Sequence, residues 1–251
     1  MHFHHLIASD IDKLKGQVVS VIGGGGKSSF LNQVACELRG QDVKLLISTT
    51  TKFQYIPEIA LVMQNENPDY LQQIEKILRE KQEVQLAKDY YKSDSKAGKL
   101  SGVDSNEFAA LRKLADLILL EADGCRQRAI KTHKAFEPVI PESTTSVVII
   151  CGVNVVGKPL HEDHVHRAEL FSRKWNLPLG TTLTPTIIAN ELLSPESYLR
   201  FVPRAASVAI LLNKADLDQK GGRQLAAELK RRCQYPIYLG SIAKNFLTRI
   251  A

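Results

Sequence analysis

Four consecutive glycines followed by a lysine and two serines form the stretch of this 251-residue chain whose residue types most clearly suggest chemistry. Glycine lets the backbone turn its N–H groups inward without a steric penalty. The Lys27 ammonium can neutralise terminal phosphates, and the Ser28 hydroxyl can bind Mg²⁺. A helix directly behind the loop would add a partial positive charge. The sequence therefore predicts a phosphate-binding loop made of Gly23, Gly24, Gly25, Gly26, Lys27, Ser28 and Ser29.

This loop is shorter than the standard phosphate-binding pattern. G-x-x-x-x-G-K-[ST] requires glycine at position 21, where the chain has Val21. The remaining G-x-x-G-K-S-S frame resembles the loop of Mur-type ligases and some other P-loop proteins. An apolar strand before it and a helical pattern after it supply the context that the motif requires.

Two acidic residues follow another apolar stretch, and their placement predicts a metal site. Residues 116–121 are typical of a buried strand, and Glu121 and Asp123 share one side of it by the period of two. In P-loop proteins a carboxylate at such a strand end holds Mg²⁺ or its water shell. We expect Mg²⁺ to be held by Ser28 together with Glu121 and Asp123. The same two acids and Lys27 are candidate catalytic residues.

Two further segments follow predicted strands and should lie near the phosphate, because ligands in open α/β sheets sit at the carboxyl ends of strands. Among Thr49–Thr51, Thr50 is the candidate for orienting a nucleophile, and the alternative is that these threonines only extend a strand. The basic loop 125–134 contributes Arg126 as a candidate catalytic residue. Its cations could meet an anionic second substrate or act as a switch, and a solvated surface loop is the equal alternative. The other cations of this loop include Arg128 and Lys131.

Two histidine-rich segments offer imidazoles that could bind metal. Within 161–167, the ligands are too closely spaced to point one way, so we favour a helix start that lines the site with Arg167 toward phosphate. His164 and His166 could instead help to hold an acceptor molecule. At the N-terminus, fraying argues against a metal site. The histidines there are His2, His4 and His5.

The tetrad Asn213-Lys214-x-Asp216 follows an apolar stretch and matches the guanine-reading motif of GTPases. A carboxylate at the last position accepts two N–H bonds that guanine donates and adenine cannot. The lysine stem covers the base, and the asparagine ties the loop together. Ser241 begins a looser version of the loop that touches the base oxygen in GTPases. These residues favour GTP over ATP, with an ordinary polar loop as the alternative.

The elements that must position these residues are predicted from apolar runs without alternation, as expected of strands covered on both faces. The pattern of strand, glycine loop, helix and strand is a βαβ unit. We therefore predict an α/β fold, a three-layer P-loop NTPase-like domain with a mainly parallel sheet and helices on both faces. It should form a single domain over 1–251 with an irregular insertion near 55–105. Within the insertion, 84–87 and 99–103 are predicted to pair as a hairpin.

Composition limits the class of protein. The chain is 44% hydrophobic and 24% charged, with a net charge of +6 and four widely spaced cysteines. It has no apolar run of membrane-spanning length and no signal-peptide pattern, so we expect a cytoplasmic protein without membrane contact. Scattered basic residues argue against nucleic acid as a partner, and a nucleotide accounts for the charge equally well.

The motifs together resemble the YqeC family, and the resemblance extends from about residue 17 to about residue 216. Besides the glycine loop, the threonines, the acids and the Asn-Lys-x-Asp tetrad, it includes Glu137–Pro141, Gly157–Pro159, His166-Arg167 and Glu169–Phe171. The resemblance implies a P-loop NTPase-like fold. It also implies an accessory role in maturing a selenium-dependent molybdenum hydroxylase, with that enzyme or its cofactor as a partner.

The predicted function is binding and hydrolysis of a nucleotide, GTP in preference to ATP, with Mg²⁺ as cofactor. One alternative is a small-molecule kinase or ligase with a Mur-type loop. Another is a non-catalytic carrier of a nucleotide-containing cofactor or a metal. Measuring phosphate release from the nucleotide, with and without an added acceptor molecule, distinguishes these three functions.

Overall fold

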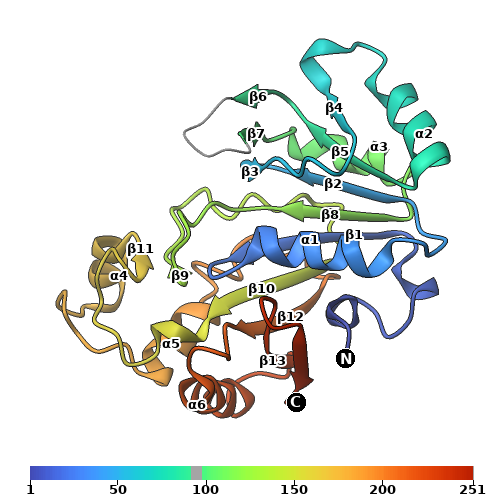
Figure 1. Cartoon of the computed structure of the whole chain (residues 1–251). Coiled ribbons are helices and arrows are strands. Elements are labelled where there is room, and N and C mark those ends of the chain that lie inside the picture. Colours follow the sequence, from blue (N-terminus) through green and yellow to red (C-terminus); the bar gives the residue numbers. More distant parts are fainter. Residues whose placement is uncertain (92–97, 251) are drawn as a thin grey trace.

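The computed structural model describes residues 1–91 and 98–250, and within them nine strands form one large sheet (Figure 1). Their order is β14-β13-β12-β10-β1-β8-β2-β5-β4, and each neighbouring pair is parallel except β13 and β14. The strands are β1 (Gln17–Gly23), β2 (Leu45–Thr49), β4 (Leu61–Met63), β5 (Glu83–Ala87), β8 (Leu117–Glu121), β10 (Ser146–Gly152), β12 (Ser207–Asn213), β13 (Ile237–Ser241) and β14 (Phe246–Arg249).

Helices cover both faces of this sheet. Alternate residues of β1 face opposite ways, so Val19 and Val21 pack with α1, whereas Val18 and Ile22 pack with the helices of the other face. The α-helices are α1 (Lys27–Leu38), α2 (Tyr70–Lys81), α3 (Phe108–Leu111), α4 (Ala168–Trp175), α5 (Pro185–Leu192) and α6 (Gln219–Lys230). This arrangement confirms the predicted α/β class with a mainly parallel sheet between two helical layers.

Shorter elements complete the described chain. The 3-10 helices are η1 (Phe3–Leu6), η2 (Asp12–Leu14), η3 (Gln64–Glu66), η4 (Ser105–Glu107) and η5 (Val153–Val155). A small antiparallel sheet joins β3 (Lys52–Gln54), β7 (Lys99–Ser101) and β6 (Tyr90–Tyr91), and a parallel pair joins β9 (Ile130–Lys131) to β11 (Val165–His166).

The hairpin predicted between 84–87 and 99–103 is wrong. The first segment is β5, which pairs in parallel with β2 and β4, while β7 pairs with β3 and β6. The physical reason is burial: four of the five residues of β5 are buried, as in the interior of the large sheet. Part of the predicted tip, 92–97, lies outside the described residues. The segment near 55–105 also contributes β4 and α2 to the large sheet and its covering layer.

The strand order brings the candidate site residues to one edge of the sheet. β1 is flanked by β8 on one side and β10 on the other, and β12 and β13 follow beyond β10 (Figure 1). Because these strands are parallel, the segments after their carboxyl ends emerge at the same edge. Ligands of open α/β sheets bind at this edge, at the point where the strand order reverses. In the described part of the chain, no helix has the length and apolarity needed to span a membrane.

Candidate functional site

The glycine loop connects β1 to α1 along a path that only glycine can follow. Gly23 has φ +97° and Gly26 has φ +134°, in a region that other residues rarely adopt. A Cβ on Gly23 would lie 2.2 Å from the carbonyl oxygen of Ile150, and a Cβ on Gly26 would lie 2.5 Å from the side-chain nitrogen of Asn213. The loop is therefore packed tightly between the ends of β10 and β12.

The N–H groups of the glycine loop are mostly committed to acceptors within the protein. Those of Gly23, Gly24 and Gly25 donate to the Asp123 carboxylate, Ile150 O and Arg128 O, at 3.0, 2.8 and 2.9 Å. Among the described residues, no side chain caps the start of α1. The first N–H groups of a helix have no intrahelical acceptor. The donors that remain for an anion are therefore those of the first turn of α1.

Lys27 is almost completely buried at the start of α1, with 3% of its surface exposed. Its Nζ donates to Gly23 O at 2.7 Å and lies 3.1 Å from Asp123 Oδ1 and 3.6 Å from Glu121 Oε1. Burial alone would lower the pKa of Lys27, but the two carboxylates raise it above its ordinary value. The Lys27 side chain therefore stays protonated and positively charged beside the glycine loop.

Ser28 and Glu121 are joined across the gap between α1 and β8. Ser28 Oγ donates to Glu121 Oε2 at 2.7 Å. Burial raises the pKa of Glu121, an effect that Lys27 and Ser28 partly oppose. Hard oxygen ligands of this kind are those that Mg²⁺ takes from proteins. A hydroxyl and a carboxylate are therefore in place to act as ligands on one side of Lys27.

Asp123 has a different environment, although it lies only two residues from Glu121. His133 Nε2 is 2.7 Å from Asp123 Oδ2, and Lys131 Nζ is 3.6 Å from the same oxygen. Burial would raise the pKa of Asp123, but Lys27, Lys131 and His133 lower it well below its ordinary value. Its oxygens are occupied by donors of the protein, so its role in this geometry is to hold Lys27 and the glycine loop.

A buried chain of hydrogen bonds continues from Asp123 into the opposite helical layer. His133 Nδ1 lies 2.9 Å from Ser197 Oγ, and that hydroxyl donates to Glu191 Oε1 at 2.6 Å. The exposed fractions of His133, Ser197 and Glu191 are at most 4%. Burial lowers the pKa of His133, while Asp123 opposes the shift. No local pattern in the sequence points to these residues, because they come from distant segments.

The threonines after β2 are used to join backbone segments. Thr49 Oγ1 donates to Glu121 O at 2.8 Å, and Thr50 Oγ1 donates to Val139 O at 2.7 Å. Thr51 N donates to Thr49 Oγ1 at 3.0 Å. The structure thus places Thr50 beside the acid-bearing strand, with its proton directed at a carbonyl.

Part of the basic loop, residues 129–133, is buried. Lys131 is completely buried and donates to Gly124 O at 2.7 Å, so in this structure it is neither solvated nor open to a second substrate. Arg167 likewise pairs with Glu137, its Nη2 lying 2.8 Å from Oε1, and its Nη1 donates to Thr132 O. The guanidinium therefore faces a carboxylate instead of the expected phosphate.

The remaining cations form a more open group beside β11. Arg126 is exposed, has φ +47° and makes no hydrogen bond or ion pair with any described residue. Arg128 Nε donates to Glu162 O. Burial, followed by the charges of Arg167, Lys131 and Arg126, lowers the pKa of His166 to about 4. His164 is half-buried, and its carbonyl accepts from the backbone of residue 129.

Asn213 links the glycine loop to the segment after β13. Its Nδ2 donates to Gly25 O at 2.8 Å, and its Oδ1 accepts from Ile242 N at 3.0 Å. Lys214 has φ +65°, and Asp216 is exposed. Ser241 is buried, and its Oγ accepts from Lys244 N at 3.2 Å.

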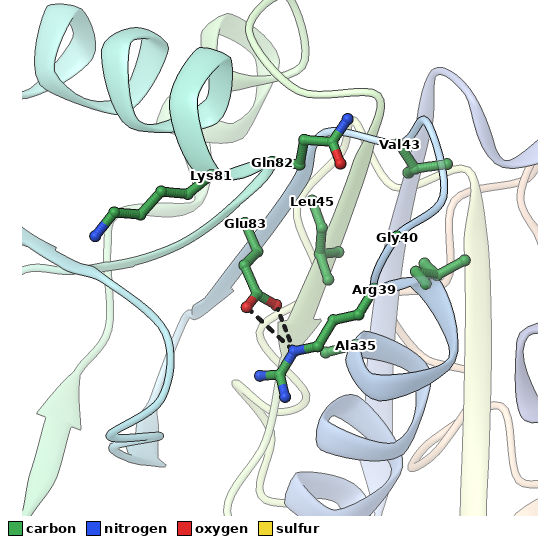
Figure 2. Close-up of a pocket in the computed structure, with 9 residues that line it drawn as sticks. Ala35, Arg39, Gly40, Val43, Leu45, Lys81, Gln82 and Glu83 are labelled. Carbon is green, nitrogen blue, oxygen red and sulfur yellow. Dashed lines mark hydrogen bonds and ion pairs between the residues drawn. The ribbon is translucent and has the colours of Figure 1, made fainter.

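A separate pocket lies at the far end of α1, away from the glycine loop. Figure 2 shows Arg39, at the end of α1, turned toward Glu83 of β5, and Arg39 Nε lies 3.1 Å from Glu83 Oε1. The pocket has a volume of about 60 Å³. Its main polar pair is already satisfied, so this pocket adds nothing to the candidate site.

Comparison with known proteins places the chain in a family. A family model described as "YqeC protein" matches residues 19–169, more than half of the chain. The "Uncharacterized protein YqeC" of Escherichia coli (strain K12) is 26% identical over 232 residues, which cover 91% of this chain and 88% of the relative. The matched range includes the glycine loop, Glu121, Asp123 and His133 and ends before Asn213. The chain belongs to the YqeC family.

Proposed function

We propose that this protein binds and hydrolyses a nucleoside triphosphate, GTP in preference to ATP, with Mg²⁺ as cofactor. The observation that carries the proposal is the arrangement of Lys27, Ser28 and Glu121 at the start of α1. Lys27 Nζ lies 3.6 Å from Glu121, whose other oxygen accepts from Ser28. A buried cation next to two oxygen ligands, at the N-terminus of a helix, is what a phosphate–metal pair requires.

The lysine would bind the phosphates, and the hydroxyl and carboxylate would bind the metal ion. Lys27 would exchange its bond to Gly23 O for the β- and γ-phosphates, while Asp123, held by His133 and Lys131, keeps the ammonium oriented. Ser28 and Glu121 would hold the Mg²⁺, which when bound neutralises charge on the phosphates. Of the two acids that the sequence offered as ligands, Glu121 has the less occupied carboxylate.

The guanine preference rests on the segment after β12. Asn213 ties the glycine loop to the segment after β13, which supports a site where one segment would hold the phosphates and the other the base. The exposed Asp216 carboxylate would accept the two N–H donors of guanine, and the Lys214 stem would cover the base. The Ser241 segment would lie against the base oxygen.

The proposed client is a selenium-dependent molybdenum hydroxylase or its cofactor, as the family resemblance implies. Bound nucleotide would order the exposed loop that carries Arg126 and thereby control docking on the client. The positive φ of Arg126, together with the absence of a hydrogen bond or ion pair from it to the described residues, supports a segment that can change its arrangement.

A titration of guanine against adenine nucleotides, with and without Mg²⁺, tests the proposal. We expect GTP to bind more tightly than ATP and Mg²⁺ to strengthen triphosphate binding. Equal affinity for GTP and ATP would overturn the guanine assignment, and binding that ignores Mg²⁺ would overturn the metal assignment.

A second candidate function is phosphoryl transfer to an anionic acceptor, as in a small-molecule kinase or ligase. The observation that favours it is Arg126, an exposed cation near His166 that makes no hydrogen bond or ion pair with any described residue. Phosphate release without any acceptor supports hydrolysis. Release that depends on an added acceptor supports transfer, and tight binding without turnover supports a carrier.

A further inference from the structure

The N-terminal segment packs on the last turn of α1 and brings three potential metal ligands together, far from the glycine loop. His2, His4 and Glu37 each offer one atom, and these atoms all lie within 4.8 Å of one another. His4 Nδ1 is 3.0 Å from Glu37 Oε2, and His2 Nδ1 is 3.9 Å from Glu37 Oε1. Fraying argues against a metal site in a loose segment, but contacts with the rest of the protein hold this segment in place.

Several contacts fix the backbone of this segment. Phe3 is completely buried, and its ring lies edge-on to Phe30 of α1, with centroids 6.4 Å apart. The Tyr238 hydroxyl donates to His5 O at 3.2 Å. The Glu37 carboxylate accepts from the N–H groups of Phe3 and His4, at 2.9 and 3.0 Å. The two inner ligands are thus positioned by packing and by main-chain hydrogen bonds.

We propose that His2, His4 and Glu37 form a binding site for a first-row divalent transition metal of the Zn²⁺ type. Two imidazoles and one carboxylate are a ligand set that Zn²⁺ accepts, with a water molecule in the fourth position. Metal–ligand bonds of about 2.0–2.2 Å put neighbouring ligand atoms roughly 3–3.5 Å apart. His4 Nδ1 and Glu37 Oε2 already have this separation, and His2 would reach it by moving inward. The metal would replace the proton shared between His4 Nδ1 and Glu37 Oε2.

The surroundings of the site favour a cation. Glu37 is on the last turn of α1, where the helix carries a partial negative charge. The side chains of Glu37 and His4 are 7% and 9% exposed, whereas that of His2 is 68% exposed. The ion would therefore enter from solvent on the His2 side. Once bound, it would fasten the N-terminal segment to the helix that begins at Lys27.

Titration of the full chain with Co²⁺, read by its visible absorption, tests this site, with Zn²⁺ as competitor. We expect one saturable Co²⁺ per chain, displacement by Zn²⁺, and a higher melting temperature with either metal, because a ligand that binds only the folded state stabilises it. His2→Ala should weaken Co²⁺ binding by about tenfold or more. Loss of a residue that only hydrogen-bonds to a metal ligand already costs about tenfold in affinity, and His2 would be a ligand itself. Its side chain is largely exposed, so the variant should fold normally.

The matched control is His161→Ala, which removes the exposed histidine paired with Asp163 at 3.0 Å on another part of the surface. This variant should bind Co²⁺ like the unmodified chain. The proposal is overturned if the unmodified chain shows no saturable binding, which would leave Glu37 as a cap of η1 only. It is equally overturned if His2→Ala binds normally, or if His161→Ala is the variant that loses the metal.

Discussion

Ser28 and Glu121 form a hydrogen bond of 2.7 Å that connects the first turn of α1 to the last residue of β8. The bond brings a hydroxyl from the phosphate-loop motif onto a carboxylate from the acid-bearing strand, 93 residues later in the chain. Lys27, the neighbour of Ser28, is held on its other side by Asp123. Glu121 therefore binds Ser28, whereas Asp123 binds Lys27, and we expect substitutions of the two acids to have different effects.

Replacing Glu121 by glutamine should abolish most of the Mg²⁺ dependence of nucleotide binding. The amide keeps the shape and can still accept from Ser28, but it lacks the anionic oxygen that a hard cation needs. We expect the Mg²⁺ concentration required for GTP binding to rise at least about tenfold. The control is Glu75→Gln on the exposed face of α2, which should change nothing. Unaltered Mg²⁺ dependence in Glu121→Gln would remove Glu121 from the metal site.

Replacing Lys27 by alanine should weaken GTP binding much more than GMP binding, because the ammonium serves the terminal phosphates. It should also destabilise the fold by about 3 kcal/mol, the cost of breaking a buried ion pair, since Glu121 and Asp123 lose their shared cation. Urea denaturation measures the second effect. Calorimetry at a temperature where the variant is folded measures the first, and an equal loss for both nucleotides would contradict the assigned role.

The sequence was sufficient for the parts of the site that are contiguous motifs, and insufficient for the contacts between them. Apolar runs predicted the parallel strands, and the glycine loop, Glu121 and Asp123 do meet at one edge of the sheet. Which carboxylate faces Ser28 and which faces His133 depends on the path of the loop after β8, and no local pattern encodes that path. The incorrect hairpin has a similar cause. The strand β7 does pair with a nearby segment, but that segment is β6, and the apolar run of β5 does not reveal that its neighbours are β2 and β4.

The same limit explains why Lys131 and Arg167 were assigned to solvent or substrate. A charge in a loop is usually exposed, so its burial cannot be inferred without knowing its partners. Here Glu137 lies 3.3 Å from Lys131 Nζ and also pairs with Arg167. Lys131 and Glu137 belong to one segment, and Arg167 comes from another that only the tertiary fold brings beside it.

Ser197→Ala should destabilise the protein although it removes a single oxygen. The hydroxyl is completely buried between His133 and Glu191, and both would lose a hydrogen-bond partner. An unsatisfied buried polar group costs about 1–3 kcal/mol. Ser29→Ala is the control: that serine is exposed and its side chain makes no hydrogen bond with any described residue, so its loss should change the free energy of unfolding by less than about 0.5 kcal/mol. Equal effects in urea denaturation would contradict the importance of this buried chain.

Stability should fall in acid, partly through Glu137. Burial would raise the pKa of Glu137, but the hydrogen bond from Arg167 and the charge of Lys131 lower it from 4.5 to about 2. The unfolded chain thus binds more protons between these values, so the stabilisation is present above about pH 4.5 and is lost as pH falls toward 2. In Glu137→Gln the free energy of unfolding should fall less steeply below about pH 4.5. Denaturation from pH 7 to pH 3 measures this dependence. A variant whose curve stays as steep would show that other groups dominate.

Asp216→Asn should change which base the protein prefers. The carboxylate of Asp216 would accept from guanine N1 and from its exocyclic amine, whereas an asparagine amide suits xanthine, which has a carbonyl in place of that amine. We expect GTP affinity to fall by about tenfold or more, since a charge-assisted hydrogen bond contributes about 1.5–3 kcal/mol, and XTP affinity to rise. Asp216 is exposed, and its side chain makes no hydrogen bond or ion pair with any described residue, so urea denaturation should be unchanged. If GTP and XTP affinities do not move while Lys27→Ala still loses GTP, the triphosphate site stands and the base is read elsewhere.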